Sequence, residues 1–338
     1  MKIRPLPFLA TAVILFAVSA CGATGGQGTT GTGDGIPVRV QLGFIPNTQN
    51  YAIPHGIADG SYAEAGLDVT YAPGGIGVEP IKVVAAGQAE IGIANGEAIV
   101  AAQGSGMKLK ILGAEFGNSP LGMLCRDDSG VETLADIAGK KIGVRPISAP
   151  GFPILLSTNH IDPGDVDVVN ISNTDEASLI AGHVACTYAD MALNEPRIVA
   201  EAGVPNHMLL AAEYGMAAPM NVYFTTEAYY EKHKDDVLRP WVHATQRQWA
   251  EFLADPTAAA NWVLAEKPVD GLDPAQEHYQ ATTMVPFLQT GYTDRNGLLA
   301  LDPEVWRTLA ENAHAAGATD TVVDTGDLLT DLASKEIR

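Results

Sequence analysis

The chain has 338 residues, which is enough for two domains of ordinary size with a substantial core. Twenty Lys and Arg residues stand against forty Asp and Glu residues, and the net charge of -20 repels nucleic acid and anionic lipid. Beyond the N-terminus, no apolar run approaches the roughly 18 residues that span a bilayer. We therefore expect a soluble body without a nucleic acid partner.

The first twenty residues have the composition of an export signal. Lys2 and Arg4 give a positive start, residues 8–18 form a short apolar core, and small residues follow at 19–20. Together they predict a signal peptide over residues 1–20. The protein is then expected to work outside the cytoplasm.

Residues 18–21, Val-Ser-Ala-Cys, resemble a bacterial lipobox, in which the cysteine is acylated and becomes the mature N-terminus. We therefore expect a lipid on Cys21 that anchors the protein to the extracytoplasmic face of the cell membrane. The alternative is a buried cysteine that follows an ordinary signal. Residues 21–35 are rich in Gly and Thr and predict a flexible tether of on the order of 20 Å.

From residue 38 onward, strand-like and helix-like hydrophobic patterns alternate. Pro80 falls in the first turn of the second predicted helix, as expected for a residue that lacks an N–H. Alternation at this spacing predicts a parallel sheet with helices on both faces. The predicted strands are 38–45, 67–72, 89–95 and 108–116, and the predicted helices are 50–66, 77–88 and 97–106.

A second run of the same kind follows and is bracketed by two extended segments, 120–128 and 218–227. Two such segments indicate two chain crossings between lobes. Residues 227–338 are expected to be mainly helical, and aromatic residues at helical spacing in 238–256 are typical of a core. The second run contains predicted helices at 132–140, 149–161 and 174–183 and predicted strands at 141–146, 165–171 and 184–189. Cys125 and Cys186 could pair, and the sequence leaves this open.

Several segments together resemble one known family, the substrate-binding lipoproteins of bacterial ABC importers. The branch concerned is similar to sulfonate-, taurine- and nitrate-binding proteins and to proteins that bind a thiamine pyrimidine precursor. The order and spacing of the segments carry the resemblance, which covers the whole mature chain. They are LGFIPNTQNYAI, AEAGLDV, IKVVAAGQAEIGIAN, TLADIAGKKIGV, NEP at 194–196 and HATQRQWAEFLADPTAAANWVL.

The resemblance implies an α/β, two-lobed type II periplasmic binding protein fold. Each lobe would be a sheet flanked by helices, and two hinge strands would join the lobes. The first lobe would comprise residues 36–120 plus 225–338, and the second lobe residues 121–224. One departure is Ala185, where the family commonly has an acidic residue.

Ligands of such sheets lie outside the carboxyl ends of the strands, where loops lead into helix N-termini. In the first lobe this rule selects polar, aromatic and glycine residues in three successive loops. Glycine lets a backbone approach a ligand closely, whereas Asn in such a loop could simply cap a helix. The residues selected are Asn47, Gln49, Tyr51, Gly75, Asn95 and Glu97.

In the second lobe, the same rule selects Arg145 and Ser148 after one strand, and Tyr188, Asn194 and Glu195 after another. A tyrosine ring can stack on a planar ligand, and a carboxylate can accept two N–H bonds from an aminopyrimidine. Alternatively, Tyr188 packs in a core and Glu195 caps a helix. Arg145 leaves an anionic ligand open.

The resemblance implies the ligand-binding subunit of an ABC importer, which we expect to be monomeric and without metal, cofactor or catalytic residues. Its leading expected ligand would be a thiamine pyrimidine precursor, and its other expected partner would be an ABC permease. Sulfonate, nitrate, taurine or a flavin is an alternative ligand. An exported enzyme acting on a pyrimidine-like compound is the alternative from another class, although the sequence has no H-E-x-x-H, G-x-S-x-G or P-loop motif.

Overall fold

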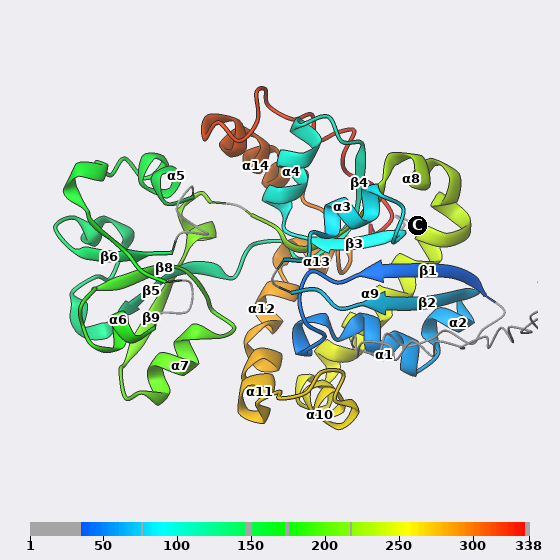
Figure 1. Cartoon of the computed structure of the whole chain (residues 1–338), viewed down its shortest axis with the longest axis horizontal. Coiled ribbons are helices and arrows are strands. Elements are labelled where there is room, and N and C mark those ends of the chain that lie inside the picture. The colour runs from blue at the N-terminus through cyan, green and yellow to red at the C-terminus, as the bar shows by residue number, and fades with distance from the viewer. Residues whose placement is uncertain (1–34, 76, 146–150, 173–175, 217, 335–338) are drawn as a thin grey trace, which may run out of the picture.

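The computed structural model describes residues 35–75, 77–145, 151–172, 176–216 and 218–334. The expected signal peptide, nearly all of the expected tether, Cys21 and Ser148 lie outside these ranges. Two lobes lie side by side (Figure 1). None of the described helices has the length and apolar character needed to cross a membrane.

A five-stranded sheet forms the centre of the first lobe. In β1, Val38 and Val40 are buried in the core and alternate with exposed residues, which is the expected pattern for a half-buried strand. Across the sheet the strands are β2 (Leu67–Ala72), β1 (Ile36–Gln41), β3 (Ile91–Ala94), β10 (Met220–Thr226) and β4 (Leu109–Phe116).

The second lobe has a five-stranded sheet of the same plan. Its strands are, in order, β7 (Asp167–Asn170), β6 (Lys141–Val144), β8 (Cys186–Met191), β5 (Leu121–Arg126) and β9 (Asn206–Leu210). Cys125 lies directly opposite Cys186 on the neighbouring strand, and the two form a disulfide. The pairing that the sequence left open is therefore present.

The expectation of purely parallel sheets was wrong for one strand in each lobe. β10 runs antiparallel to β3 and β4, and β5 runs antiparallel to β8 and β9. Each is the first strand after the chain enters its lobe from the other one. The chain therefore crosses once between β4 and β5 and once between β9 and β10, and the extended segments at 120–128 and 218–227 lie largely within the sheets.

The pairing of β10 also moves the expected boundary of the second lobe. We placed that boundary at residue 224, inside β10, but the whole strand belongs to the first sheet. The first crossing segment lies against the start of β10, because the Ser119 hydroxyl donates to the Met220 sulfur at 3.3 Å. The peptide N–H of Gly96 also bonds the carbonyl of Pro219 at 2.8 Å.

Asp-Pro pairs start three of the first lobe's helices. Asp255, Asp273 and Asp302 each accept a backbone N–H of the first turn, and proline follows at the first helical position, where its missing N–H is harmless. The first-lobe helices are α1 (Ala52–Ala58), α2 (Ser61–Glu64), α3 (Pro80–Ala85), α4 (Gly96–Gly104), α8 (Glu227–His233), α9 (Arg239–Ala254), α10 (Pro256–Glu266), α11 (Pro274–Thr283), α12 (Val285–Leu288), α13 (Gly291–Asn296) and α14 (Pro303–Ala315). The second lobe contains α5 (Gly151–Thr158), α6 (Ala177–Ile180) and α7 (Glu195–Glu201).

The expected helix over 50–66 is divided into separate turns. A short 3-10 helix, η1 (Thr48–Asn50), precedes α1, and Gly60 separates α1 from α2. Gly60 has φ of 83°, a left-handed conformation that a helix cannot contain and that glycine adopts without strain. The expected helix over 132–140 is a 3-10 helix, η3 (Leu134–Ile137).

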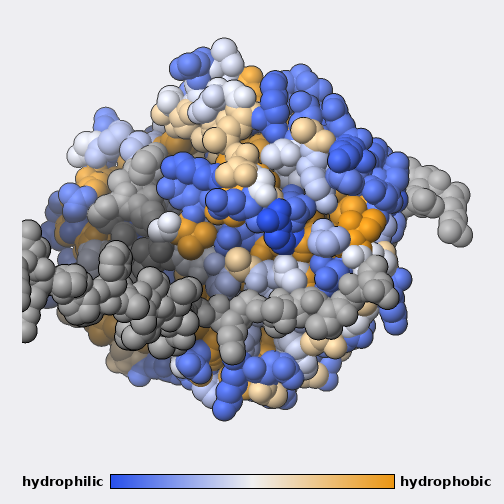
Figure 2. Space-filling model, turned by 45° about the vertical axis from the view of Figure 1, so that its right-hand side comes forward, coloured by the Kyte–Doolittle hydropathy of each residue, from blue (hydrophilic) through white to orange (hydrophobic). Residues whose placement is uncertain are grey.

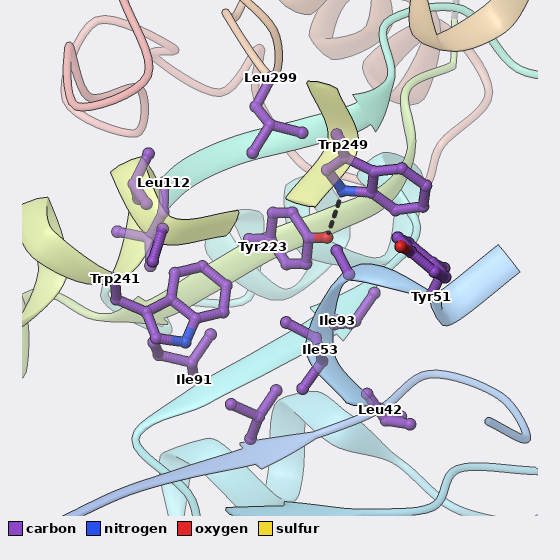
Figure 3. Packing of buried hydrophobic residues seen from close by; sticks show 14 of the residues in the cluster. Leu42, Tyr51, Ile53, Ile91, Ile93, Leu112, Tyr223, Trp241, Trp249 and Leu299 are labelled. Carbon is purple, nitrogen blue, oxygen red and sulfur yellow. Dashed lines mark hydrogen bonds between the residues drawn. The ribbon is translucent and has the colours of Figure 1, made fainter. Parts of the chain in front are cut away.

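The largest hydrophobic core lies in the first lobe between its sheet and α9 (Figure 3). Trp241, Trp249 and Phe252 of α9 are fully buried, which confirms the core expected from their helical spacing. Trp249 donates its indole N–H to the hydroxyl of Tyr223 at 3.0 Å. On the face drawn in Figure 2, hydrophilic residues predominate and the hydrophobic areas are separate.

Candidate functional site

The loop after β1 carries polar residues that reach toward the second lobe. Asn47 caps η1, because its side-chain oxygen accepts the N–H of Gln49 at 3.2 Å. Gln49 is buried, and its amide nitrogen donates to the sulfur of Met191 at 3.1 Å. Met191 ends β8, so this bond joins the two lobes at the carboxyl ends of their strands.

Tyr51 is held within the first-lobe core. Its ring stacks on His55 at a centroid distance of 4.5 Å and meets Trp262 edge-on at 5.7 Å. Desolvation raises the pKa of its hydroxyl above the ordinary value for tyrosine. The ring is therefore occupied by packing in the core, which is not the ligand contact expected from the sequence.

The loops after β1 and β2 lie in close backbone contact. A Cβ on Gly74 would lie 2.4 Å from the carbonyl carbon of Gly43, so only glycine fits there. The N–H of Gly74 donates to the carbonyl of Phe44 at 2.9 Å. Gly75, with φ of 142°, follows in the same loop.

Phe44 was missed in the sequence analysis, although it stands in the loop after the first strand. Its side chain is 49% exposed, and its backbone carbonyl is fixed by the bond from Gly74, so a half-exposed aromatic ring stands beside the polar residues of this loop. The signal was available, since Phe44 is an aromatic residue in the loop that leads from the first strand to the polar residues 47–51. Phe44 joins the candidate site residues.

Asn95 and Glu97 lie at the start of α4, after β3, and both are exposed. Surrounding protein nevertheless desolvates the Glu97 carboxyl and raises its pKa above the ordinary value for Glu. The Glu97 charge also acts on Tyr188 of the second lobe and contributes to the raised pKa of that phenol.

Tyr188 lies in β8 and is 6% exposed. Its ring packs against Phe152 at a centroid distance of 5.1 Å. Its hydroxyl lies at the start of α5, where a Cβ on Gly151 would be 2.9 Å from the hydroxyl oxygen. Burial, followed by the Glu97 charge, raises the Tyr188 pKa to about 12, so the hydroxyl is a neutral hydrogen-bonding group at physiological pH.

Arg145 follows β6, which lies beside β8 in the sheet. The side chain is 3% exposed, and its guanidinium pairs with the Glu176 carboxylate at 3.4 Å. A ligand anion would therefore compete with an internal carboxylate for this cation.

Glu195 and Asn194 form the turn between β8 and α7. The Glu195 carboxylate accepts the backbone N–H of Met191 at 2.7 Å and the side-chain amide of Asn194 at 3.3 Å. These two bonds join Glu195 to the end of β8 and to Asn194, the N-cap residue of α7, so they differ from the helix cap considered as an alternative from the sequence. Glu195 thus holds the turn that carries Met191, and Met191 in turn accepts the bond from Gln49.

A groove of about 640 Å³ lies elsewhere, between the second lobe and α11. Its lining includes Arg197, Asn206 and Tyr279 and none of the expected ligand residues. Within the described residues, His55, Asp59 and Glu251 have ligand atoms close enough together to hold a metal ion. His55 already bonds Gln248 at 2.5 Å and Asp59 already accepts Ser61 at 2.8 Å, so a cation would have to displace existing bonds.

Comparison with known proteins defines the class first. The fold is that of periplasmic binding proteins: the chain is similar to the periplasmic aliphatic sulphonate-binding protein SsuA of Escherichia coli, with a TM-score of 0.62 and 16% identity over 89% of this chain and 95% of that one. The desulfurization enzyme DSZB has a similar fold, with a TM-score of 0.58 and 15% identity over 88% and 97% of the two chains.

The chain belongs to the NMT1/THI5-like family, whose model matches residues 47–259. It is also 26% identical, over 297 residues, to the riboflavin-binding protein RibY of Chloroflexus aurantiacus. That match covers 85% of this chain and 83% of RibY. The family relation expected from the sequence motifs is therefore confirmed.

Proposed function

We propose that the protein is the extracytoplasmic solute-binding subunit of an ABC importer and captures a planar, nitrogen-rich ring compound between its lobes. The observation that carries the proposal is the approach of residues from both lobes at the carboxyl ends of their strands. Gln49 bonds Met191, and the Glu97 charge acts on Tyr188. A ligand placed there would touch both lobes, as capture by closure requires.

The aromatic and acidic residues favour a heteroaromatic ligand over a small anion. Phe44 offers an exposed ring for stacking, and the Glu97 carboxyl can accept hydrogen bonds from N–H groups at a ring edge. Arg145, the cation expected to bind an anion, is already paired with Glu176. The family relation supports an aminopyrimidine precursor of thiamine as ligand, and the likeness to RibY supports riboflavin.

Isothermal titration calorimetry tests the proposal with three probes: the thiamine pyrimidine precursor, riboflavin and an aliphatic sulfonate. We expect saturable binding of one of the two ring compounds and none of the sulfonate. Binding of the sulfonate alone would refute the heteroaromatic class.

Catalysis is the second candidate, because an enzyme, DSZB, shares the fold. Mass spectrometry of each mixture after prolonged incubation separates capture from turnover. We expect each probe to be recovered unchanged.

The proposal includes a lipid on Cys21, a permease partner and a monomeric state. Cys21→Ala should release the protein from the membrane fraction and abolish incorporation of labelled palmitate, because no other residue of the expected lipobox carries a thiol. Wild-type protein that incorporates no palmitate would contradict the anchor. Binding by the soluble body is independent of this outcome.

A further inference from the structure

We propose that helix α11 couples the ligand loop, residues 47–51 of the first lobe, to a clamp turn, residues 191–194 of the second lobe. The inference rests on the proposed function for its biological meaning, but its test requires no ligand. In Figure 1, α11 lies between the lobes, next to α7. Its side chains make hydrogen bonds to both segments.

One face of α11 holds the ligand loop. Glu277 is 2% exposed, and its carboxylate accepts the backbone N–H of Thr48 at 2.9 Å. One turn further along, Gln280 accepts the side-chain amide of Asn47 at 3.3 Å. These two bonds fix the backbone and the capping residue of the same 3-10 turn.

A neighbouring face of α11 holds the clamp turn. Gln276 donates its side-chain amide to the carbonyl of Leu193 at 2.8 Å, and Tyr279 donates its hydroxyl to the carbonyl of Ala192 at 2.9 Å. Leu193 is fully buried and belongs to the hydrophobic core of the first lobe. A turn of the second lobe is therefore inserted into the first.

Arg197 of α7 completes the contact between the lobes. Its guanidinium lies 2.7 Å from the carboxylate of Asp273, the residue that caps α11, and donates to Gln276 at 3.3 Å. Because α11 is a single ten-residue helix, a shift of its clamp face also displaces Glu277 and Gln280. Movement of one lobe relative to the other should therefore displace the residues that hold the ligand loop.

Hydrogen–deuterium exchange of the ligand-free protein tests the coupling. Arg197→Ala removes the bonds from α7 of the second lobe to Asp273 and Gln276, and it changes no contact of the ligand loop. We expect at least about three-fold faster exchange in peptides covering 47–51, because the loop loses protection when its supporting helix loosens. The matched control is Arg126→Ala, which removes an arginine of the same lobe whose bonds to Asp128, Leu179 and Ile180 all stay within that lobe.

The reciprocal variant is Glu277→Gln, which weakens the bond to Thr48 on the other face. Coupling requires faster exchange in peptides covering 191–194, since thermodynamic coupling acts equally in both directions. Unchanged exchange of 47–51 in a folded Arg197→Ala protein would overturn the proposal, as would equal acceleration by Arg126→Ala. If Arg197→Ala does not fold, Tyr279→Phe removes one cross-lobe hydroxyl and is judged by the same peptides.

A failure of ligand binding leaves these results intact. Calorimetry with riboflavin and the thiamine pyrimidine precursor tests the proposed function, whereas exchange tests the coupling in the free protein. The two hypotheses can therefore fail separately.

Discussion

At the scale of single residues, Glu115 is a buried acid close to a crossing between the lobes. It accepts hydrogen bonds from the hydroxyl of Tyr223 and, at 2.8 Å, from the amide of Asn221, which lies opposite it on β10. Burial raises its pKa to about 8, against an ordinary value of 4.5. The nearby titratable groups are Tyr223, on the neighbouring strand, and Tyr62 of α2.

The raised pKa gives a definite sign for pH dependence. The folded protein holds the Glu115 proton more tightly than the unfolded chain, so this stabilisation is complete below about pH 4.5 and is lost as pH rises through about 8. The loss between these limits is on the order of a few kcal/mol. Glu115→Gln should therefore flatten the fall in melting temperature between pH 6 and pH 9, measured by circular dichroism. Parallel pH profiles for the two proteins would contradict this role.

Phe44 provides a second test at the residue scale. Because its ring is half exposed, Phe44→Ala should leave the melting temperature nearly unchanged and weaken binding of a ring ligand about two- to ten-fold by loss of stacking. Phe44→Tyr is the matched control and should retain affinity. Affinities of all three proteins follow from titration with whichever ring compound binds the wild type. Equal affinities would remove Phe44 from the site.

At the scale of elements, local patterns predicted strands better than they predicted strand direction. The strand expected at 67–72 was confirmed without change as β2, because buried residues alternate with more exposed ones along the whole segment. β10 and β5 were recognised as extended, but their antiparallel direction depends on the lobe from which the chain arrives. Local sequence patterns do not indicate from which lobe the chain arrives. The break at Gly60 could have been anticipated from the glycine, whereas β9 had no predicted counterpart.

The disulfide between β5 and β8 should contribute strongly to stability. Cys125 and Cys186 are separated by 61 residues, and in the chain-entropy model closing such a loop is worth about 4 kcal/mol. Protein that is unfolded, reduced and then refolded should therefore unfold at a lower urea concentration than protein with the disulfide intact. The native protein should resist the same reductant, because both cysteines are fully buried. Identical midpoints would show that the bridge adds nothing to stability.

At the scale of the whole molecule, the sequence predicted one part of the candidate site, namely the loops at the carboxyl ends of the strands. Gln49, Glu97 and Tyr188 were selected by one rule about carboxyl ends, and the structure brings residues of both lobes together there. The contribution of α11 could not be predicted in this way. Glu277 lies 229 residues from Thr48 along the chain, and a contact so distant leaves no trace in local spacing.

The two crossings predict a change of overall shape on binding. A ligand that touches both lobes stabilises the closed arrangement by its higher affinity for that arrangement. Small-angle X-ray scattering should therefore show a smaller radius of gyration when a ring ligand saturates the protein. The sulfonate that does not bind serves as the control. An unchanged radius with the ligand at saturation would rule out closure.

The position of β10 sets an order of events for a chain that emerges from an export channel N-terminus first. All five strands of the second sheet lie between Leu121 and Leu210, so that lobe is complete as soon as those residues have emerged. The first sheet must wait for β10, which inserts between β3 and β4 only after the entire second lobe has passed. The second lobe should thus fold first, and β3 and β4 should lack the strand that joins them until β10 has emerged.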